Sequence, residues 1–391
     1  MEILTASLQE YTASFSLNKF IMLLMVIFMI VGGIDRIIGN KFGFGEEFAK
    51  GFEALGDLAT AMVGMIALVP VIKIVFGSAL GAFFSMIGSD PSLFSGIVLG
   101  MDLGGYSLSM SLANTPDLGL FTGIIIASVM GINIVFNIPV GMGIIDEKDQ
   151  PYLAVGMLIG FITIPVAIIA GGLVMMVSGF EVTIHDIIFN TIPVAVVAAA
   201  IAAGLLLAQK AILKGFIAFG KGVTAVVTFG TMVAVAQYLT GIHLPLFHVM
   251  VEADAEGVVP LIDAIEVVGE IGLVLLGAFP LVLFITRAFK KPLNAIGTKM
   301  GLDQAGIGGL IATIANTIPM FGMMKDMSPK SKIFNCAFAV STCFALGDHL
   351  GFVAGVNQQM IVPMIAAKFA GGISALILAS LLWEKLLPKE D

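Results

Sequence analysis

The chain alternates long apolar stretches with short polar ones, and the lengths of the apolar stretches indicate the fold class. A helix needs roughly 20 apolar residues to cross the hydrocarbon layer of a bilayer, which is about 30 Å thick. Eleven stretches approach this length, near residues 19–38, 57–77, 92–112, 118–143, 153–177, 187–208, 223–241, 266–289, 305–324, 333–354 and 360–383. The pattern predicts an all-α polytopic membrane protein.

Two of the eleven stretches, 92–112 and 305–324, are predicted to enter the membrane and return to the same side. Each contains a break halfway along, "MDLGGYS" at 101–107 and "ANTIPMFG" at 315–322. Irregular backbone is tolerated at membrane depth only where protein or a water-filled cavity covers it. We therefore expect about nine full spans plus two re-entrant hairpins.

The distribution of lysine and arginine supports this count of spans. Cytoplasmic loops of membrane proteins carry an excess of these two residue types. If all eleven stretches crossed, the basic clusters would fall on both sides of the membrane. With two re-entrant hairpins they all fall on one side, the cytoplasm, and the acidic loop 252–266 faces outward. The N-terminus is then outside and the C-terminus inside.

The two halves of the chain resemble each other. An offset of 213 residues pairs identical residues early in each half, and an offset of 216 pairs them later. The pairs include Asp90 with Asp303, Gly96 with Gly309, Gly131 with Gly347 and Gly156 with Gly372. Inverted repeats with discontinuous helices are common in secondary transporters, which bind substrate near the midplane where the repeats meet. We expect two inverted-topology repeats with broken helices.

The repeat divides the chain into four parts. They are an N-terminal segment with the first span (1–50), repeat 1 (51–180), linking spans (181–262) and repeat 2 (263–391). Each repeat has a span, a hairpin, a broken span and a further span. The breaks are expected in "GINIVFNIPVG" (131–141) of the span 118–143 and in "LGDHLGFVAG" (346–355) of the span 333–354. The first and third parts are expected to form a scaffold.

Composition agrees with a membrane protein and gives weight to the few charged residues in the spans. The 391 residues are 58% hydrophobic and 12% charged, with a mean hydropathy of +1.06. An ionisable side chain inside a membrane is costly unless paired or hydrated, so it suggests function. Asp102 lies at the tip of the first hairpin, and Asp348 and His349 lie at the second broken span. Alternatively, the carboxylates cap freed N–H groups and His349 is merely hydrogen-bonded.

Neutral polar residues accompany these charges at the other breaks. Asn316 and Thr317 lie at the tip of the second hairpin, and Asn133 and Asn137 lie at the break of the first broken span. They offer hydrogen-bonding groups to a substrate, or they satisfy freed backbone groups alone. Lys368 is expected to extend its charge to the membrane surface along its apolar stem.

Several kinds of function are not expected. The sequence has no phosphate-binding glycine loop, no nucleotide fingerprint and no basic patch with interleaved aromatic residues, which argues against ATP drive and nucleic-acid binding. His243 and His248 have no Cys or acidic residues at metal-ligand spacing, and we expect no metal and no cofactor.

The candidate residues suggest the chemistry of a substrate. A membrane cavity with two carboxylates and no arginine or unpaired lysine favours a cation over an anion. Amides and hydroxyls beside the acids would suit a small molecule with both an ammonium and a hydroxyl group. Two alternatives are an intramembrane aspartyl hydrolase, in which two carboxyl groups share a proton, and a non-transporting subunit of a membrane complex.

Three stretches resemble a known family. With "GMDLGGYSLSMSLA" (100–113), "IANTIPMFGMMKDMSPKSK" (314–332) and "FALGDHLGF" (344–352), the chain resembles the bacterial ethanolamine permease family of ethanolamine-utilisation operons (EutH-like), from about residue 20 to the C-terminus. The resemblance implies uptake of ethanolamine, a hydroxyl-bearing ammonium ion, across the bacterial inner membrane by a transporter and not an enzyme. Transport of another small amine or cation is the alternative. The resemblance supplies no binding residues. It also leaves open whether the coupling ion is H⁺ or Na⁺ and whether the protein is a homo-oligomer.

Overall fold

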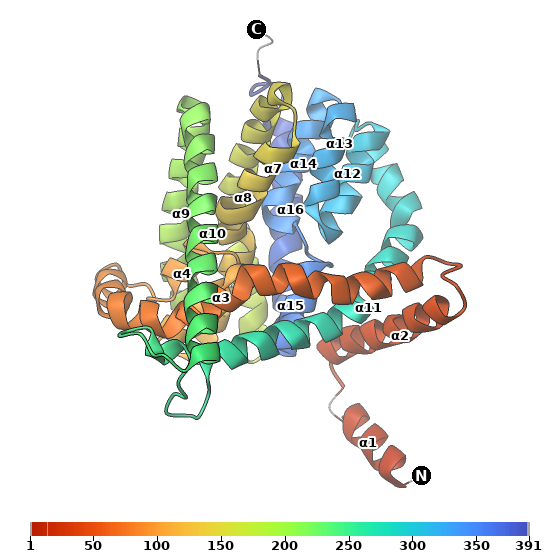
Figure 1. The fold of residues 1–391 in the computed structure, drawn as a ribbon. Coiled ribbons are helices and arrows are strands. Elements are labelled where there is room, and N and C mark those ends of the chain that lie inside the picture. The colour runs from red at the N-terminus through yellow and green to blue at the C-terminus, as the bar shows by residue number, and fades with distance from the viewer. Residues whose placement is uncertain (1, 14, 389–391) are drawn as a thin grey trace.

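The protein is a bundle of helices (Figure 1). The computed structural model describes residues 2–13 and 15–388, which form helices and no strand. Residues 1, 14 and 389–391, which belong to the predicted first and last parts, lie outside the described residues. Eight helical stretches within the described residues are long and apolar enough to cross a membrane, which confirms the all-α polytopic class. They are α2 (Leu17–Ile37), α3 (Phe44–Met86), α6 to α7 (Pro116–Ile144), η4 with α8 (Glu147–Val177), α9 (Ile184–Leu207), α10 (Gln209–Thr240), α11 (Pro260–Lys299) and η7 with α16 (Gln358–Leu382).

These eight helical stretches match eight of the nine predicted spans, and the ninth is broken. It consists of α14 (Pro329–Thr342) and α15 (Asp348–Val356), separated by residues 343–347. Each predicted hairpin is two short helices joined at the predicted break. The first comprises α4 (Leu93–Val98), η1 (Met101–Leu103) and α5 (Gly105–Leu112), and the second comprises α12 (Gln304–Ala315) and α13 (Thr317–Met323). Their return to the same membrane face stays a prediction.

The long helices fall into two groups that cross each other. In Figure 1, α2, α3 and α11 run across the lower part of the view and pack together, whereas α8, α9, α14 and α16 stand upright and pack together. Two further helices join the groups. The helix α10 contacts α3 of the first group and α9 of the second, and α15 contacts α11 of the first group and α16 of the second. The predicted scaffold helices α2 and α9 therefore belong to different groups.

The same carboxylate contact closes both hairpins. Asp90, before α4, accepts a hydrogen bond from the Asn114 N–H, after α5, at 3.0 Å. Asp303, before α12, accepts one from the Ser328 N–H, after α13, at 2.7 Å, and another from the Gly306 N–H at 2.7 Å. Each carboxylate thus ties the entrance of its hairpin to the exit. These equivalent contacts support the predicted repeat, whose inverted orientation stays a prediction.

Replacing Asp303 by asparagine is expected to destabilise the protein in a pH-dependent way. Partial burial alone would raise the pKa of the Asp303 carboxyl, but hydrogen bonds from Ser328 and Gly306 outweigh it and lower the pKa from 3.8 to about 2. A carboxyl with a lowered folded-state pKa stabilises above its unfolded pKa and loses this effect as pH falls through the folded value. We expect Asp303→Asn to cost about 1–3 kcal/mol at pH 6, with the difference shrinking below pH 3.8.

Reversible unfolding in mixed micelles at several pH values measures this difference. Asp326→Asn, which changes an exposed carboxylate in η6 (Met324–Asp326), is the control and should be neutral. A cost for Asp303→Asn that does not change between pH 6 and pH 3 would show that the ionised carboxylate is not what ties the hairpin.

Equivalent glycines also hold each hairpin against a helix that follows it. A Cβ atom on Gly131 would overlap with the carbonyl oxygen of Leu99, at the end of α4. A Cβ atom on Gly347 would overlap with the carbonyl oxygen of Ala315, at the end of α12. Both pairs are related by the offset of 216 residues. Only glycine therefore fits where the broken end of each hairpin meets the next helix.

The break predicted at 131–141 is wrong, because the helix there is continuous. The helix runs from α6 (Pro116–Leu120) through the π-helical segments η2 (Phe121–Gly131) and η3 (Asn133–Asn137) into α7 (Ile138–Ile144). An offset of 213 still relates Ser128 to Ser341, whereas 216 relates Gly131 to Gly347, so the second half has three more residues between these points. Those three extra residues fall in the open break 343–347. In the first half, the equivalent stretch stays helical and forms the wider turns of a π-helix.

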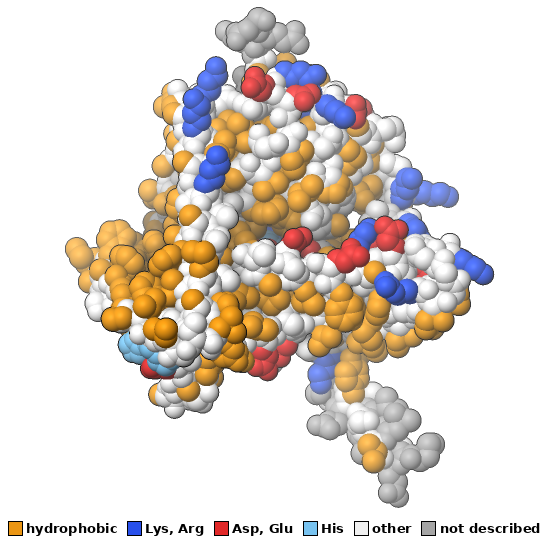
Figure 2. Space-filling view, viewed as in Figure 1, with side chains coloured by type: hydrophobic (Ala, Val, Ile, Leu, Met, Phe, Trp, Pro, Cys, Tyr) orange, Lys and Arg blue, Asp and Glu red, His pale blue; other side chains and the backbone are white. Residues whose placement is uncertain are grey.

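Large apolar side chains remain exposed over much of the surface. Examples are Ile74 and Phe76 on α3 and Ile192 and Val196 on α9, each more than half exposed. Figure 2 shows such side chains gathered over the lower left of the view and lysine and arginine along its upper and right edges. A lipid-facing surface explains this pattern. The two cysteines, Cys336 and Cys343, are free and fully buried.

Candidate functional site

The seven candidate residues lie together in one polar centre where the two hairpins meet the π-helical segment η3 and the start of α15. Three contacts build it: Asp102 with His349, Asn316 with Asp348, and Thr317 with Asn137 and Asn133. The chain neighbours Asn316 and Thr317, and likewise Asp348 and His349, connect the three contacts. Sequence reasoning therefore found residues that the fold brings together from four separate segments.

Asp102 and His349 face each other across the centre. Asp102 is held in η1 of the first hairpin, and His349 is in the first turn of α15. Asp102 Oδ2 lies 3.7 Å from His349 Nε2, too far for a hydrogen bond, and the two side chains are 16% and 0% exposed. Asp102 Oδ1 and both ring nitrogens of His349 are buried without a hydrogen-bond partner among the described residues. Such groups are costly to bury, and this part of the centre therefore has unused hydrogen-bonding capacity.

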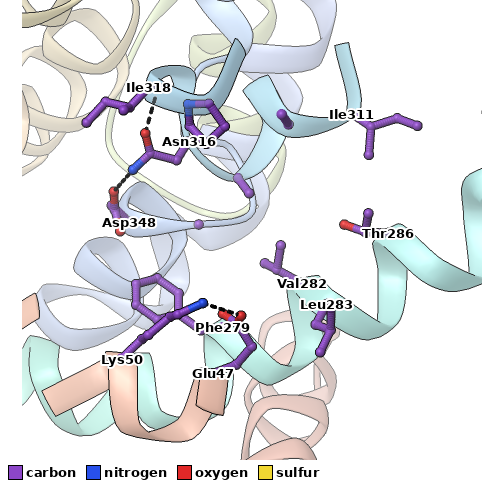
Figure 3. A pocket seen from close by; sticks show the side chains of 14 residues that line it. Glu47, Lys50, Phe279, Val282, Leu283, Thr286, Ile311, Asn316, Ile318 and Asp348 are labelled. Atoms are coloured by element: carbon purple, nitrogen blue, oxygen red, sulfur yellow. Dashed lines mark hydrogen bonds and ion pairs between the residues drawn. The ribbon is translucent and has the colours of Figure 1, made fainter. Parts of the chain in front are cut away.

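Asp348 and Asn316 form the second contact, and it opens onto a cavity. Asn316 caps α13 by accepting a hydrogen bond from the Ile318 N–H at 2.9 Å, and its amide donates to Asp348 Oδ2 at 3.4 Å. Figure 3 shows these two side chains pointing toward each other at one wall of the cavity. The cavity measures about 510 Å³. It is large enough for a small amine beside the carboxylate.

The third contact is a row of amides and a hydroxyl. Thr317 Oγ donates to Asn137 Oδ1 at 3.0 Å, and Asn137 Nδ2 donates to Asn133 Oδ1 at 2.9 Å. Asn133 Nδ2 in turn donates to the Val340 carbonyl of α14 at 2.8 Å. The row links the second hairpin, the π-helical segment and α14. These side chains therefore satisfy one another and the backbone as well as lining the centre.

Sequence reasoning missed the opposite wall of the cavity. Glu47 and Lys50, in the first turns of α3, line it and form an ion pair at 2.8 Å (Figure 3). Because Glu47 compensates Lys50, the cavity holds no unpaired positive side chain among its lining residues. A second cavity of about 590 Å³ reaches Leu103 and Phe136, the chain neighbours of Asp102 and Asn137. The polar centre thus opens onto one cavity through Asn316 and Asp348, and a second cavity comes as near as the chain neighbours of Asp102 and Asn137.

The expectation for Lys368 is wrong. Lys368, on α16, is 0% exposed, and its ammonium does not extend to the membrane surface. It donates to the carbonyl oxygens of Ser128 at 2.8 Å, Cys343 at 2.8 Å and Ser341 at 3.3 Å. Those carbonyls come from the π-helical segment and the end of α14. No sequence signal marks a backbone carbonyl, so this contact could not be predicted.

Comparison with known proteins identifies the family. Residues 17–382 match the family described as "Ethanolamine utilisation protein, EutH". This chain is a member of the EutH family. All seven residues of the polar centre lie within the matched region.

Three relatives show how similar this chain is to known proteins, and two of them carry the family's name. The chain is 46% identical over 374 residues to "Probable ethanolamine permease EutH" of Listeria monocytogenes, covering 96% of both chains. It is 43% identical over 402 residues to the protein of the same name from Escherichia coli, covering 96% of this chain and 97% of that one. It is also 39% identical over 360 residues to "Uncharacterized protein YxeR" of Bacillus subtilis. No solved structure matches the chain.

Proposed function

We propose that the protein is a secondary transporter that takes up ethanolamine across the bacterial inner membrane by alternating access. EutH relatives with 43–46% identity are named probable ethanolamine permeases. The observation that carries the proposal is the polar centre, in which two carboxylates and buried, unpartnered polar atoms come together beside a cavity. A cation with a hydroxyl group complements these side chains.

In this proposal, Asp102 and Asp348 neutralise the ammonium group of ethanolamine. Charge-assisted hydrogen bonds from an ammonium to a carboxylate are the strong ones in a low-dielectric site. Each carboxylate comes from a different repeat, so the substrate would bridge the halves of the molecule. The amide of Asn316, Asn133 or Asn137 forms a hydrogen bond with the hydroxyl group. Thr317 and His349 complete the proposed binding site.

The arrangement of the helices supports alternating access. The hairpins, with their tips at the polar centre, act as gates. Movement of the group containing α3 and α11 against the group containing α8 and α16 opens one cavity and closes the other. In Figure 1, α1 (Glu2–Ala13) and the C-terminal end of the described chain lie at opposite ends of the molecule, which supports termini on opposite sides of the membrane. The distribution of basic residues in the loops favours an N-terminus outside and a C-terminus in the cytoplasm.

The contacts of the two carboxylates favour transport over hydrolysis. An aspartyl hydrolase needs two carboxyl groups that share a proton. Here Asp102 Oδ2 faces His349 Nε2 at 3.7 Å, and Asp348 accepts a hydrogen bond from Asn316. The carboxylates therefore have separate partners, as suits two contacts to one cation.

Uptake of labelled ethanolamine into proteoliposomes tests the proposal. The purified protein is expected to give saturable uptake that other small hydroxylated amines inhibit and that glycerol does not, because glycerol lacks the ammonium group. Inhibition by an amine that is itself taken up faster would move the assignment to that amine. Absence of saturable uptake of any amine by folded protein would overturn the transporter assignment.

A further inference from the structure

Lys368 holds together the point at which the second repeat is broken. The last four carbonyl groups of a helix have no partner within it. At the end of α14, two of these carbonyls accept from backbone N–H groups of the break, and the Val340 carbonyl accepts from Asn133 at 2.8 Å. The remaining one, that of Ser341, accepts from Lys368 at 3.3 Å. The break is therefore closed by an amide and an ammonium from other helices.

The carbonyl oxygens around Lys368 form a cradle drawn from both halves of the chain. Ser128 O and Cys343 O each lie 2.8 Å from the ammonium nitrogen. Ser128 and Ser341 are related by the offset of 213 residues, so equivalent carbonyls of the two repeats converge on one positive charge. Carbonyls at helix breaks, with the negative end of a helix dipole, are the ligands that hold monovalent cations in transporters.

The ammonium group of Lys368 is in direct contact with these dipoles and not with an acid. Among the ion pairs of the described residues, no carboxylate lies within 4.0 Å of Lys368. By contrast Lys332, the other strongly buried lysine, lies 2.6 Å from Asp149. A buried lysine that contacts only carbonyl oxygens and a thiol occupies the position of a dehydrated cation.

From these contacts we infer that the carbonyl cradle is a monovalent-cation site and that Lys368 is its resident cation. The tethered ammonium stabilises the break that a free sodium ion would otherwise stabilise. Because the site is permanently filled, ethanolamine uptake does not require sodium. This last step rests on the proposed function, whereas the cation site itself does not.

Removing the side chain tests the site without reference to transport. We expect Lys368→Ala to lower the melting temperature in detergent in N-methylglucamine chloride, and NaCl at equal ionic strength to raise it again by several degrees, saturably, since a ligand that binds only the folded state stabilises it. Met364→Ala, one turn earlier on α16 and also fully buried, is the matched control and should not respond to sodium. Equal melting temperatures of Lys368→Ala in the two salts, or an equal sodium response of Met364→Ala, would overturn the inference.

Wild-type protein provides a second test that does not depend on the folding of a variant. Uptake of ethanolamine is expected to proceed at the same rate with sodium or N-methylglucamine on both sides of the membrane. A strict requirement for sodium would overturn the inference and leave the proposed transport intact. Absence of uptake in both salts would overturn the proposed function, and the melting experiment would still decide on the cation site.

Discussion

Replacing Asp348 by asparagine is expected to lower the rate of ethanolamine uptake at low substrate concentration at least about 30-fold. The variant keeps the shape of the side chain and its contact with Asn316 but loses the negative charge at the cavity wall. Removing one partner of a buried, hydrogen-bonded charge pair costs about 2–5 kcal/mol, and each 1.4 kcal/mol is about tenfold in affinity. Initial rates in proteoliposomes, at equal amounts of reconstituted protein, measure the effect.

Two further variants test whether the effect of Asp348→Asn is specific to the polar centre. Asp326→Asn removes a carboxylate that is exposed and outside the polar centre, and it should keep the wild-type rate. Asp102→Asn should also lose uptake, because the ammonium is proposed to contact both acids. Wild-type uptake by a folded Asp348→Asn protein would exclude Asp348 from the site and leave the first hairpin as the place where the cation binds.

Replacing Lys332 by methionine is expected to destabilise the protein by about 3–5 kcal/mol, the usual cost of breaking a buried ion pair from one side. Lys332, in the first turn of α14, lies 2.6 Å from Asp149, next to α8, and their side chains are 9% and 2% exposed. The variant would leave the Asp149 carboxylate buried and unpaired. The free energy of unfolding in mixed micelles measures the loss.

The double variant separates loss of the pair from loss of packing. Lys332→Met with Asp149→Asn has no uncompensated charge, so it should recover most of the stability that Lys332→Met loses. Lys325→Met, which changes an exposed lysine nearby, should be neutral. If the double variant is as unstable as Lys332→Met alone, the buried charge of Asp149 is not the cause.

Most of the fold followed from hydrophobic length and from the residues at breaks. The hairpin tips were predictable because "MDLGG" and "ANTIP" combine glycine, proline and short polar side chains that do not continue a helix. The continuous helix through 131–141 was not predictable, because glycine and asparagine suit an open break and a π-helical stretch equally well. The backbone of the folded chain shows that the π-helical stretch forms in the first half and the open break in the second.

The candidate site was predictable where its chemistry lies in side chains. Asp102, Asp348 and His349 are conspicuous because ionisable groups are rare in spans. Asn316, the partner of Asp348, and Asn137, the partner of Thr317, were found because they lie at predicted breaks, although the pairing itself needed the fold. The place of Lys50 on the cavity wall could not be predicted, because no local pattern encodes which helix packs opposite Asp348.

The burial of both native cysteines makes the chain well suited to chemical labelling. Cys336 and Cys343 are 0% exposed, and they are the two thiols of the sequence. A water-soluble, membrane-impermeant maleimide therefore has no native target in the folded protein, and a single cysteine introduced in a loop would react alone. One such cysteine at Glu256 and another at Lys41, labelled in intact cells, would test which of the two loops faces outward, as predicted for the acidic loop 252–266.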